Sequence, residues 1–120
     1  MDITPRVPAD RKIVSGYGGG GFRINAERVE GSVLVFPDRW LAWDGDLSVA
    51  SLAPVIADAT VELLLLGCGP SLKPVPNDIR TALQAAGKRV EPMDTGAACR
   101  TYAVLLGEGR RVAAALIALP

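Results

Sequence analysis

Two short, almost wholly apolar stretches in the second half of the chain constrain its fold most. Residues 61–66 read Val-Glu-Leu-Leu-Leu-Leu, and residues 112–119 read Val-Ala-Ala-Ala-Leu-Ile-Ala-Leu. Both have the length of a strand and are far shorter than the ~20 residues of a membrane-spanning helix. A strand that is apolar on both faces belongs inside a sheet with helices on either side. The chain is therefore predicted to be an α/β domain.

Helical patterns alternate with these strands. Ile79 and Leu83 fall on one helical face, and Gly87 follows as a residue that readily ends a helix. Asp94 or Thr95 is a suitable N-cap for a later helix. The predicted order is a helix over 48–58, a strand over 61–66, a helix over 76–86, a strand over 89–93, a helix over 94–108 and a strand over 112–119.

One segment fits two structures. Residues 102–106 and 111–117 are joined by Gly-Glu-Gly and have the pattern of a β-hairpin. The cap at residue 94 and the alanines that follow it favour a helix instead. We therefore predict the helix and keep the hairpin as the alternative.

The first half of the chain reads as β structure. Four consecutive glycines at residues 18–21 predict a tight or bulged turn, and Asp44-Gly45 predicts another turn. Strands are predicted over residues 12–17, 22–24, 29–36 and 39–43. Together with the second half, this order indicates a mixed sheet with an N-terminal antiparallel portion. Residues 12–120 are expected to form one domain, preceded by a flexible lead-in at residues 1–11 that lacks a secretory signal.

Composition excludes several classes of function. The 120 residues include 49% apolar and 22% charged residues, which is typical of a globular domain. The absence of histidine removes Ser-His-Asp triads, Cys-His pairs and histidine-ligated metal sites. The formal net charge of zero argues against nucleic-acid binding. Two cysteines without CxxC spacing are typical of reduced cytoplasmic thiols, so no metal, cofactor or disulfide framework is expected.

The tripeptide Asp94-Thr95-Gly96 resembles the catalytic motif of aspartic proteases. Those enzymes need two carboxylates that share a proton, which a short chain would supply by dimerising. The motif lies too near the C-terminus for a protease fold and is followed by a helical pattern. A helix start explains the same residues better, because Asp94 and Thr95 can satisfy free backbone N–H groups there.

A second candidate site combines a glycine loop with this helix start. Residues 67–71 follow a buried strand, which is where open α/β sheets place ligand crevices. The helix start and Arg100 would attract an anion and lower the pKa of a nearby thiol, although packing explains both cysteines as well. The candidate cleft residues are Gly67, Cys68, Gly69, Asp94, Thr95, Gly96, Cys99, Arg100 and Tyr102.

A third group of residues suits a protein partner. Trp40 and Trp43 are three positions apart in a predicted strand and therefore face opposite sides, so one of them can be exposed. Arg110 and Arg111 make the C-terminal part locally basic. Core packing of the tryptophans and simple solvation of the arginines are the alternatives.

The ordered motifs of the chain resemble a known family. Tyr17-Gly18, Gly21-Phe22-Arg23-Ile24, residues 62–69, residues 93–102 and residues 108–115 look like the adipogenesis-associated Mth-like domain family. The resemblance spans about residues 12–119. Two positions depart from the family pattern, since Cys68 stands where a threonine is usual and Ala103 where an asparagine is usual.

The resemblance implies a single three-layer α/β domain around a mixed sheet. It implies no catalytic reaction, because the family includes bacterial proteins of unknown activity and a mitochondrial assembly factor for respiratory complex I. On this basis we expect a non-enzymatic interaction or assembly protein in the cytoplasm, whose partners include respiratory or inner-membrane protein subunits. A small-molecule or anion-binding domain, or a weak enzyme, at residues 67–71 and 95–100 is the alternative.

Overall fold

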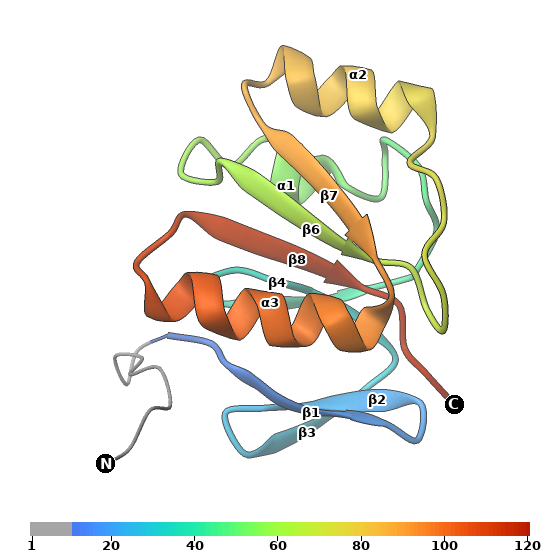
Figure 1. Cartoon of the computed structure of the whole chain (residues 1–120), viewed down its shortest axis with the longest axis vertical. Coiled ribbons are helices and arrows are strands. Elements are labelled where there is room, and N and C mark those ends of the chain that lie inside the picture. The colour runs from blue at the N-terminus through green and yellow to red at the C-terminus, as the bar shows by residue number, and fades with distance from the viewer. Residues whose placement is uncertain (1–10) are drawn as a thin grey trace.

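The computed structural model describes residues 11–120, in which two β-sheets and three helices pack into one body (Figure 1). The expected lead-in lies outside the described residues except for residue 11. The elements are β1 (Val14–Gly18), β2 (Gly21–Ile24), β3 (Glu27–Glu30), β4 (Ser32–Val35), β5 (Trp40–Trp43), α1 (Ala53–Ile56), β6 (Leu63–Gly67), α2 (Asn77–Ala85), β7 (Arg89–Met93), α3 (Thr95–Gly107) and β8 (Val112–Leu116).

The larger sheet has five strands in the order β5-β4-β8-β6-β7. Strand β6 pairs in parallel with β7 and β8, whereas β4 pairs antiparallel with β5 and β8. The two apolar stretches thus become β6 and β8, which lie side by side within the sheet. The predicted α/β class and mixed sheet are confirmed.

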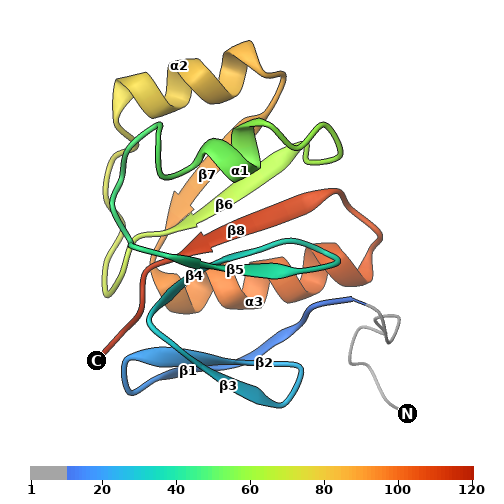
Figure 2. The same ribbon diagram turned by 180° about the vertical axis from the view of Figure 1, so that it is seen from behind.

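Alternate side chains of this sheet contribute to two separate cores. Leu64 and Leu66 of β6 point to one face, where they pack with residues of α1 and α2. Leu65 points to the other face, which α3 and the smaller sheet cover. Figures 1 and 2 show the same arrangement, with α3 on one side of the sheet and α1 on the other. Because both faces are covered, strands without polar side chains are stable there.

The smaller sheet contains β1, β2 and β3, and all its pairings are antiparallel. Gly18 pairs with Gly21, so Gly19 and Gly20 form a two-residue hairpin loop in which both have positive φ, at 62° and 85°. This is the turn predicted from the four glycines. Arg28 holds the turn, since its guanidinium donates to the carbonyl oxygens of Gly18 and Gly19 at 3.0 and 2.8 Å.

The strand predicted over residues 29–36 is wrong as a single element. Gly31, with φ of 82°, breaks it into β3 and β4, which belong to different sheets. Positive φ is incompatible with an extended strand but free of strain for glycine. Gly31 is therefore the corner at which the chain leaves the small sheet for the large one.

The helices agree with the predicted order and differ in length. Helix α3 occupies residues that would have formed the alternative hairpin, and Gly109 with φ of 75° follows its end. Helix α1 is only four residues long, with Pro54 in its first turn, while Ser48 accepts from the Ser51 N–H in the preceding turn. Within residues 11–120 no helix has the length and apolar character needed to cross a membrane.

Candidate functional site

The structure brings the glycine loop and the start of α3 into direct contact. A Cβ added to Gly67 would lie 3.2 Å from Thr95 Cα and 3.3 Å from Ala98 Cβ. Strand β6 can reach α3 this closely only because residue 67 has no side chain. Gly67, Gly69, Thr95 and Gly96 of the expected cleft therefore lie together.

Most polar groups at this junction bond to one another. The Thr95 hydroxyl donates to the Ile117 carbonyl oxygen at 2.8 Å and accepts from the Gly69 N–H at 2.9 Å. The Thr95 N–H donates to the Gly69 carbonyl oxygen at 2.8 Å, and Asp94 Oδ1 accepts from the Ala97 N–H at 2.8 Å. The side chain of Thr95 is fully buried. Asp94-Thr95-Gly96 thus forms a helix cap, and Thr95 joins α3 to the ends of β6 and β8.

The two cysteines lie on opposite faces of the large sheet. Cys68 packs in the core beneath α1 and α2, whereas Cys99 packs in the core beneath α3. Both are buried free thiols. Burial raises the pKa of the Cys99 thiol to about 12, with Arg100 lowering it by a smaller amount. Both cysteines therefore have the packing role, and the alternative of a low thiol pKa does not hold for Cys99, because desolvation is a larger effect than Arg100.

The side chains of Arg100 and Tyr102 lie in different environments, the first at the surface and the second in the core. Arg100 is exposed, and its Nη1 donates to the Tyr17 hydroxyl at 3.1 Å. Tyr17 lies over Gly96, where an added Cβ would be 2.6 Å from its hydroxyl. Tyr102, on the inward face of α3, is fully buried, and its hydroxyl has no hydrogen-bond partner among the described residues. Burial raises its pKa well above the usual value.

Two cavities lie at the opposite end of α3. The first, about 330 Å³, is lined by Arg11, Pro37, Asp38, Thr60, Val61, Leu106, Gly109, Arg110 and Arg111. The second, about 400 Å³, is lined by Glu62, Leu63, Gly87, Arg89, Glu91, Leu105 and Arg110. Arg110 lines both cavities. Two of the expected partner residues, Arg110 and Arg111, are thus exposed at this end.

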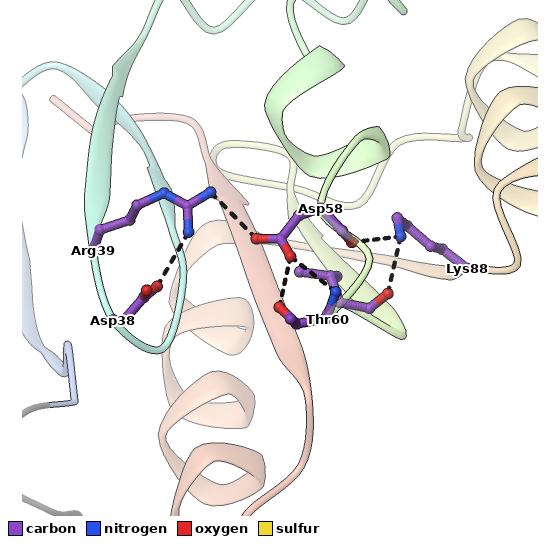
Figure 3. A network of polar contacts seen from close by, with 6 residues as sticks. Asp38, Arg39, Asp58, Thr60 and Lys88 are labelled. Atoms are coloured by element: carbon purple, nitrogen blue, oxygen red, sulfur yellow. Dashed lines mark hydrogen bonds and ion pairs between the residues drawn. The ribbon is translucent and has the colours of Figure 1, made fainter.

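A polar network ties three loops together beside these cavities (Figure 3). Asp58 accepts from Thr60 Oγ1 at 2.6 Å, from the Thr60 N–H at 2.9 Å and from Arg39 Nη2 at 3.2 Å. The Thr60 hydroxyl is the largest cause of the lowered pKa of Asp58. Lys88, only 5% exposed, donates to the carbonyl oxygens of Asp58 and Val61 at 2.7 and 3.1 Å.

Sequence reasoning did not find this network. An aspartate side chain can accept from the backbone N–H two residues later, which here is that of Thr60. This part of the network could therefore have been predicted from the sequence. Lys88 follows the glycine that ends α2, and nothing in the local sequence indicates that this lysine is buried. Its partners lie about thirty positions away along the chain, so only the fold reveals them.

The two tryptophans of β5 take opposite sides, as their spacing predicted. Trp43 is 7% exposed and packs into the core under α1 and α2, and its Nε1 has no hydrogen-bond partner among the described residues. Trp40 is half-buried and packs against the other core. Of the expected partner residues, the two arginines are therefore at the surface, Trp40 is partly there, and Trp43 is inside.

Comparison with known proteins places the chain in a family. The family model described as protein of unknown function (DUF498/DUF598) matches residues 14–117. The chain belongs to this family. An uncharacterized family relative from Rhodobacter capsulatus is 38% identical over 120 residues, covering 98% of this chain and 95% of the relative.

Other relatives carry a functional name. The NADH dehydrogenase (ubiquinone) 1 alpha subcomplex assembly factor 3 of Danio rerio is 34% identical over 125 residues, covering all of this chain and 72% of that factor. The human factor of the same name is 28% identical, and 68% of its length is covered. The resemblance to the Mth-like family, with its assembly factor and uncharacterised bacterial members, is confirmed.

Solved structures show the same fold. A crystal structure described as an outer membrane protein from Bartonella henselae superposes with a TM-score of 0.88 at 32% identity, covering 98% of this chain and 99% of that one. A solution structure from Bordetella pertussis, described as a Mth938-like domain, superposes with a TM-score of 0.76 at 30% identity, covering 98% and 92%. The DUF498/DUF598 fold therefore extends over nearly the whole chain.

The positions of the polar and charged side chains limit the chemistry that the glycine junction and the far end of α3 can support. Among residues 11–120, no three Cys, Asp or Glu side chains are grouped closely enough to hold a metal ion. At the glycine junction the Thr95 hydroxyl and the backbone groups bond to one another, while three arginines line the first cavity beyond the C-terminal end of α3. That end offers cations for recognition of a partner or ligand.

Proposed function

We propose that this chain is a non-enzymatic interaction protein that takes part in the assembly of NADH:ubiquinone oxidoreductase. The observation that carries the proposal is the match to the Danio rerio assembly factor, which extends over the entire chain at 34% identity. Partners are then subunits or assembly intermediates of that complex. The protein acts by contact with them, without chemical conversion.

The outer face of α3 is the surface that best suits such a partner. Thr95, Ala98, Cys99, Tyr102 and Leu106 of this helix point inward. Arg100 and Val104 point outward, and Val104 is 47% exposed. An exposed β-branched side chain beside an arginine fits the composition of a small interface, in which apolar contacts are surrounded by charges. Tyr17, 43% exposed and bonded to Arg100, extends the same face.

Deletion of the gene in its native host tests the proposed function. We expect less assembled NADH:ubiquinone oxidoreductase on native gels, measured by in-gel NADH oxidation, and recovery when the gene is restored. Succinate dehydrogenase serves as the control complex, because a general loss of membrane protein would lower both. Unchanged amounts of assembled complex in the deletion strain would contradict the proposal.

A pair of surface variants tests the α3 face. Val104→Asp places a charge in the expected interface, whereas Leu72→Asp does the same at a more exposed position, 63%, in the loop before α2. We expect Val104→Asp to fail to restore the complex in the deletion strain and Leu72→Asp to restore it. Equal behaviour of two folded variants would show that α3 is not the contact surface.

A further inference from the structure

The cavity at the C-terminal end of α3 has the features of a ligand site. Its volume of about 330 Å³ lies at the small end of the range for small-molecule sites. It is bounded by the β4–β5 turn at Pro37, the α1–β6 loop at Thr60, and the α3–β8 loop at Gly109. A Cβ at Gly109 would meet no atom within 4 Å, so the rim is open at this point.

Positive charge predominates around the cavity. Three arginines line it against a single acidic residue. That residue, Asp38, already accepts from Arg39 Nη1 at 3.1 Å, and Arg111 forms an ion pair with Glu62. Within residues 11–120, Arg11 and Arg110 make no ion pair. Within the described part of the chain, Arg11 and Arg110 therefore line this cavity without an ion-pair partner, although Arg110 also acts on the charge of Glu62.

Apart from Thr60 and Gly109, the uncharged lining of the cavity is apolar, and a buried tyrosine lies within reach of its charges. Pro37, Val61 and Leu106 provide hydrophobic wall. Tyr102, one turn before Leu106 on α3, has a buried hydroxyl without a partner among the described residues, and the charges that act on it are those of Arg11 and Asp38 at the cavity. A buried polar group without a partner calls for an explanation such as a bound water or ligand nearby.

We propose that this cavity binds a small organic anion, a carboxylate or a phosphate ester with an apolar body. Arg110 and Arg11 hold the anionic group, because guanidinium forms strong paired hydrogen bonds with carboxylate and phosphate oxygens. Pro37, Val61 and Leu106 contact the apolar body. The negative end of the α3 dipole opposes an anion here, but this effect is weak at an exposed helix end beside two arginines.

This site is separate from the proposed assembly function. It also differs from the anion site expected at the glycine loop, which would use the start of α3 together with Arg100. The two locations can be distinguished, since both arginines are exposed, Arg100 in the middle of α3 and Arg110 in the loop after it. Each serves as the matched control for the other.

The test is an NMR titration of the full chain with phenyl phosphate, benzoate and inorganic phosphate at constant ionic strength. We expect saturable shifts of the Gly109, Arg110 and Thr60 amides with phenyl phosphate or benzoate, and weaker binding of inorganic phosphate. Comparison of the two aromatic anions identifies the preferred group. Arg110→Ala is expected to raise the dissociation constant about tenfold, the equivalent of one charged hydrogen-bonded contact, and Arg100→Ala to leave it unchanged.

Three results would overturn the proposal. The first is the absence of saturable shifts at anion concentrations up to about 10 mM, the limit of weak specific binding. The second is binding that Arg110→Ala does not weaken although the variant keeps the folded spectrum. The third is shifts centred on Gly69 and Gly96 that Arg100→Ala abolishes, which would place the anion at the glycine loop instead.

Discussion

At the scale of single residues, desolvation decides the chemistry of the two thiols. Cys99 has an arginine next to it in sequence and lies just after the first turn of a helix, which both favour a thiolate. Its side chain is nevertheless buried between α3 and the sheets. The cost of a charge in that environment exceeds the attraction, so the thiol stays neutral across the physiological range.

The raised pKa of Cys99 predicts a loss of stability in alkaline solution. The thiol pKa is about 12 in the folded protein against an ordinary 9.0, so the unfolded chain releases its proton first. The neutral thiol therefore contributes fully to the free energy of unfolding below pH 9, and this contribution declines as the pH rises from 9 towards 12. Between these values the free energy of unfolding should fall with a slope of up to about 1.4 kcal/mol per pH unit from this group.

Denaturant unfolding of the protein and of Cys99→Ala at a series of pH values measures this effect. Tyr102 shifts in the same direction from a higher starting pKa, so the range just above pH 9 isolates the thiol best. We expect the slope there to be shallower in Cys99→Ala, whatever its absolute stability. Identical slopes would mean that Cys99 titrates normally.

At the scale of elements, glycines set where strands can approach one another. Gly21 of β2 faces the backbone of β3, and an added Cβ would overlap the Val29 carbonyl oxygen and lie 3.0 Å from Glu30 Cα. Gly16 of β1 has space, because its added Cβ would lie 3.6 Å from Arg23 Cβ. Neither has positive φ, so the two differ in space and not in backbone conformation.

These two glycines form a matched pair for mutation. Gly21→Ala should lower the free energy of unfolding by about 2 kcal/mol, since the overlap is with backbone that cannot rotate away. Gly16→Ala should change it by less than about 0.5 kcal/mol or raise it, because alanine restricts the unfolded chain. Urea denaturation of both variants checks the difference. A loss in Gly16→Ala as large as that in Gly21→Ala would contradict the role of close approach.

At the scale of the whole molecule, Lys88 joins segments that the chain connects only distantly. Its ammonium group binds the backbone of the α1–β6 loop, and Asp58 of that loop binds Arg39 at the β4–β5 turn. The network therefore links three loops at one end of the large sheet (Figure 3). A lysine this deeply buried is stable only because carbonyl oxygens accept its N–H groups.

Lys88→Met tests this link, because methionine preserves the unbranched chain and removes the donor. We expect the free energy of unfolding to fall by about 2 kcal/mol, since the Val61 carbonyl oxygen loses a charged hydrogen-bond donor. Lys73→Met, at an exposed position in the loop before α2, should change it by less than about 0.5 kcal/mol. Chemical denaturation of both measures the difference, and equal small effects would show that the network adds no stability.

Features that depend on residues close together in the sequence were predictable, whereas features that depend on contacts between distant segments were not. The helix starting at Asp94 was predictable because its cap and its inward-facing residues lie within a few positions of one another. The break at Gly31 was missed because the apolar pattern of residues 29–36 continues across it. For the candidate site, the sequence indicated that the glycine loop and the start of α3 would meet. It did not indicate that Thr95 would use its hydroxyl to join β6 and β8.

The sequence by itself determined the α/β class, the order of elements in the second half of the chain and the absence of histidine chemistry, because periodicity and composition are local properties. Tertiary structure decided which polar groups are available. It placed Cys68 and Cys99 in separate cores and brought Arg11, separated from Arg110 by most of the chain, to the same cavity. Burial and long-range contact depend on how distant segments pack. For this reason the apolar stretches at residues 61–66 and 112–119 predicted the sheet, but they did not predict which surface residues would line a cavity or face a partner.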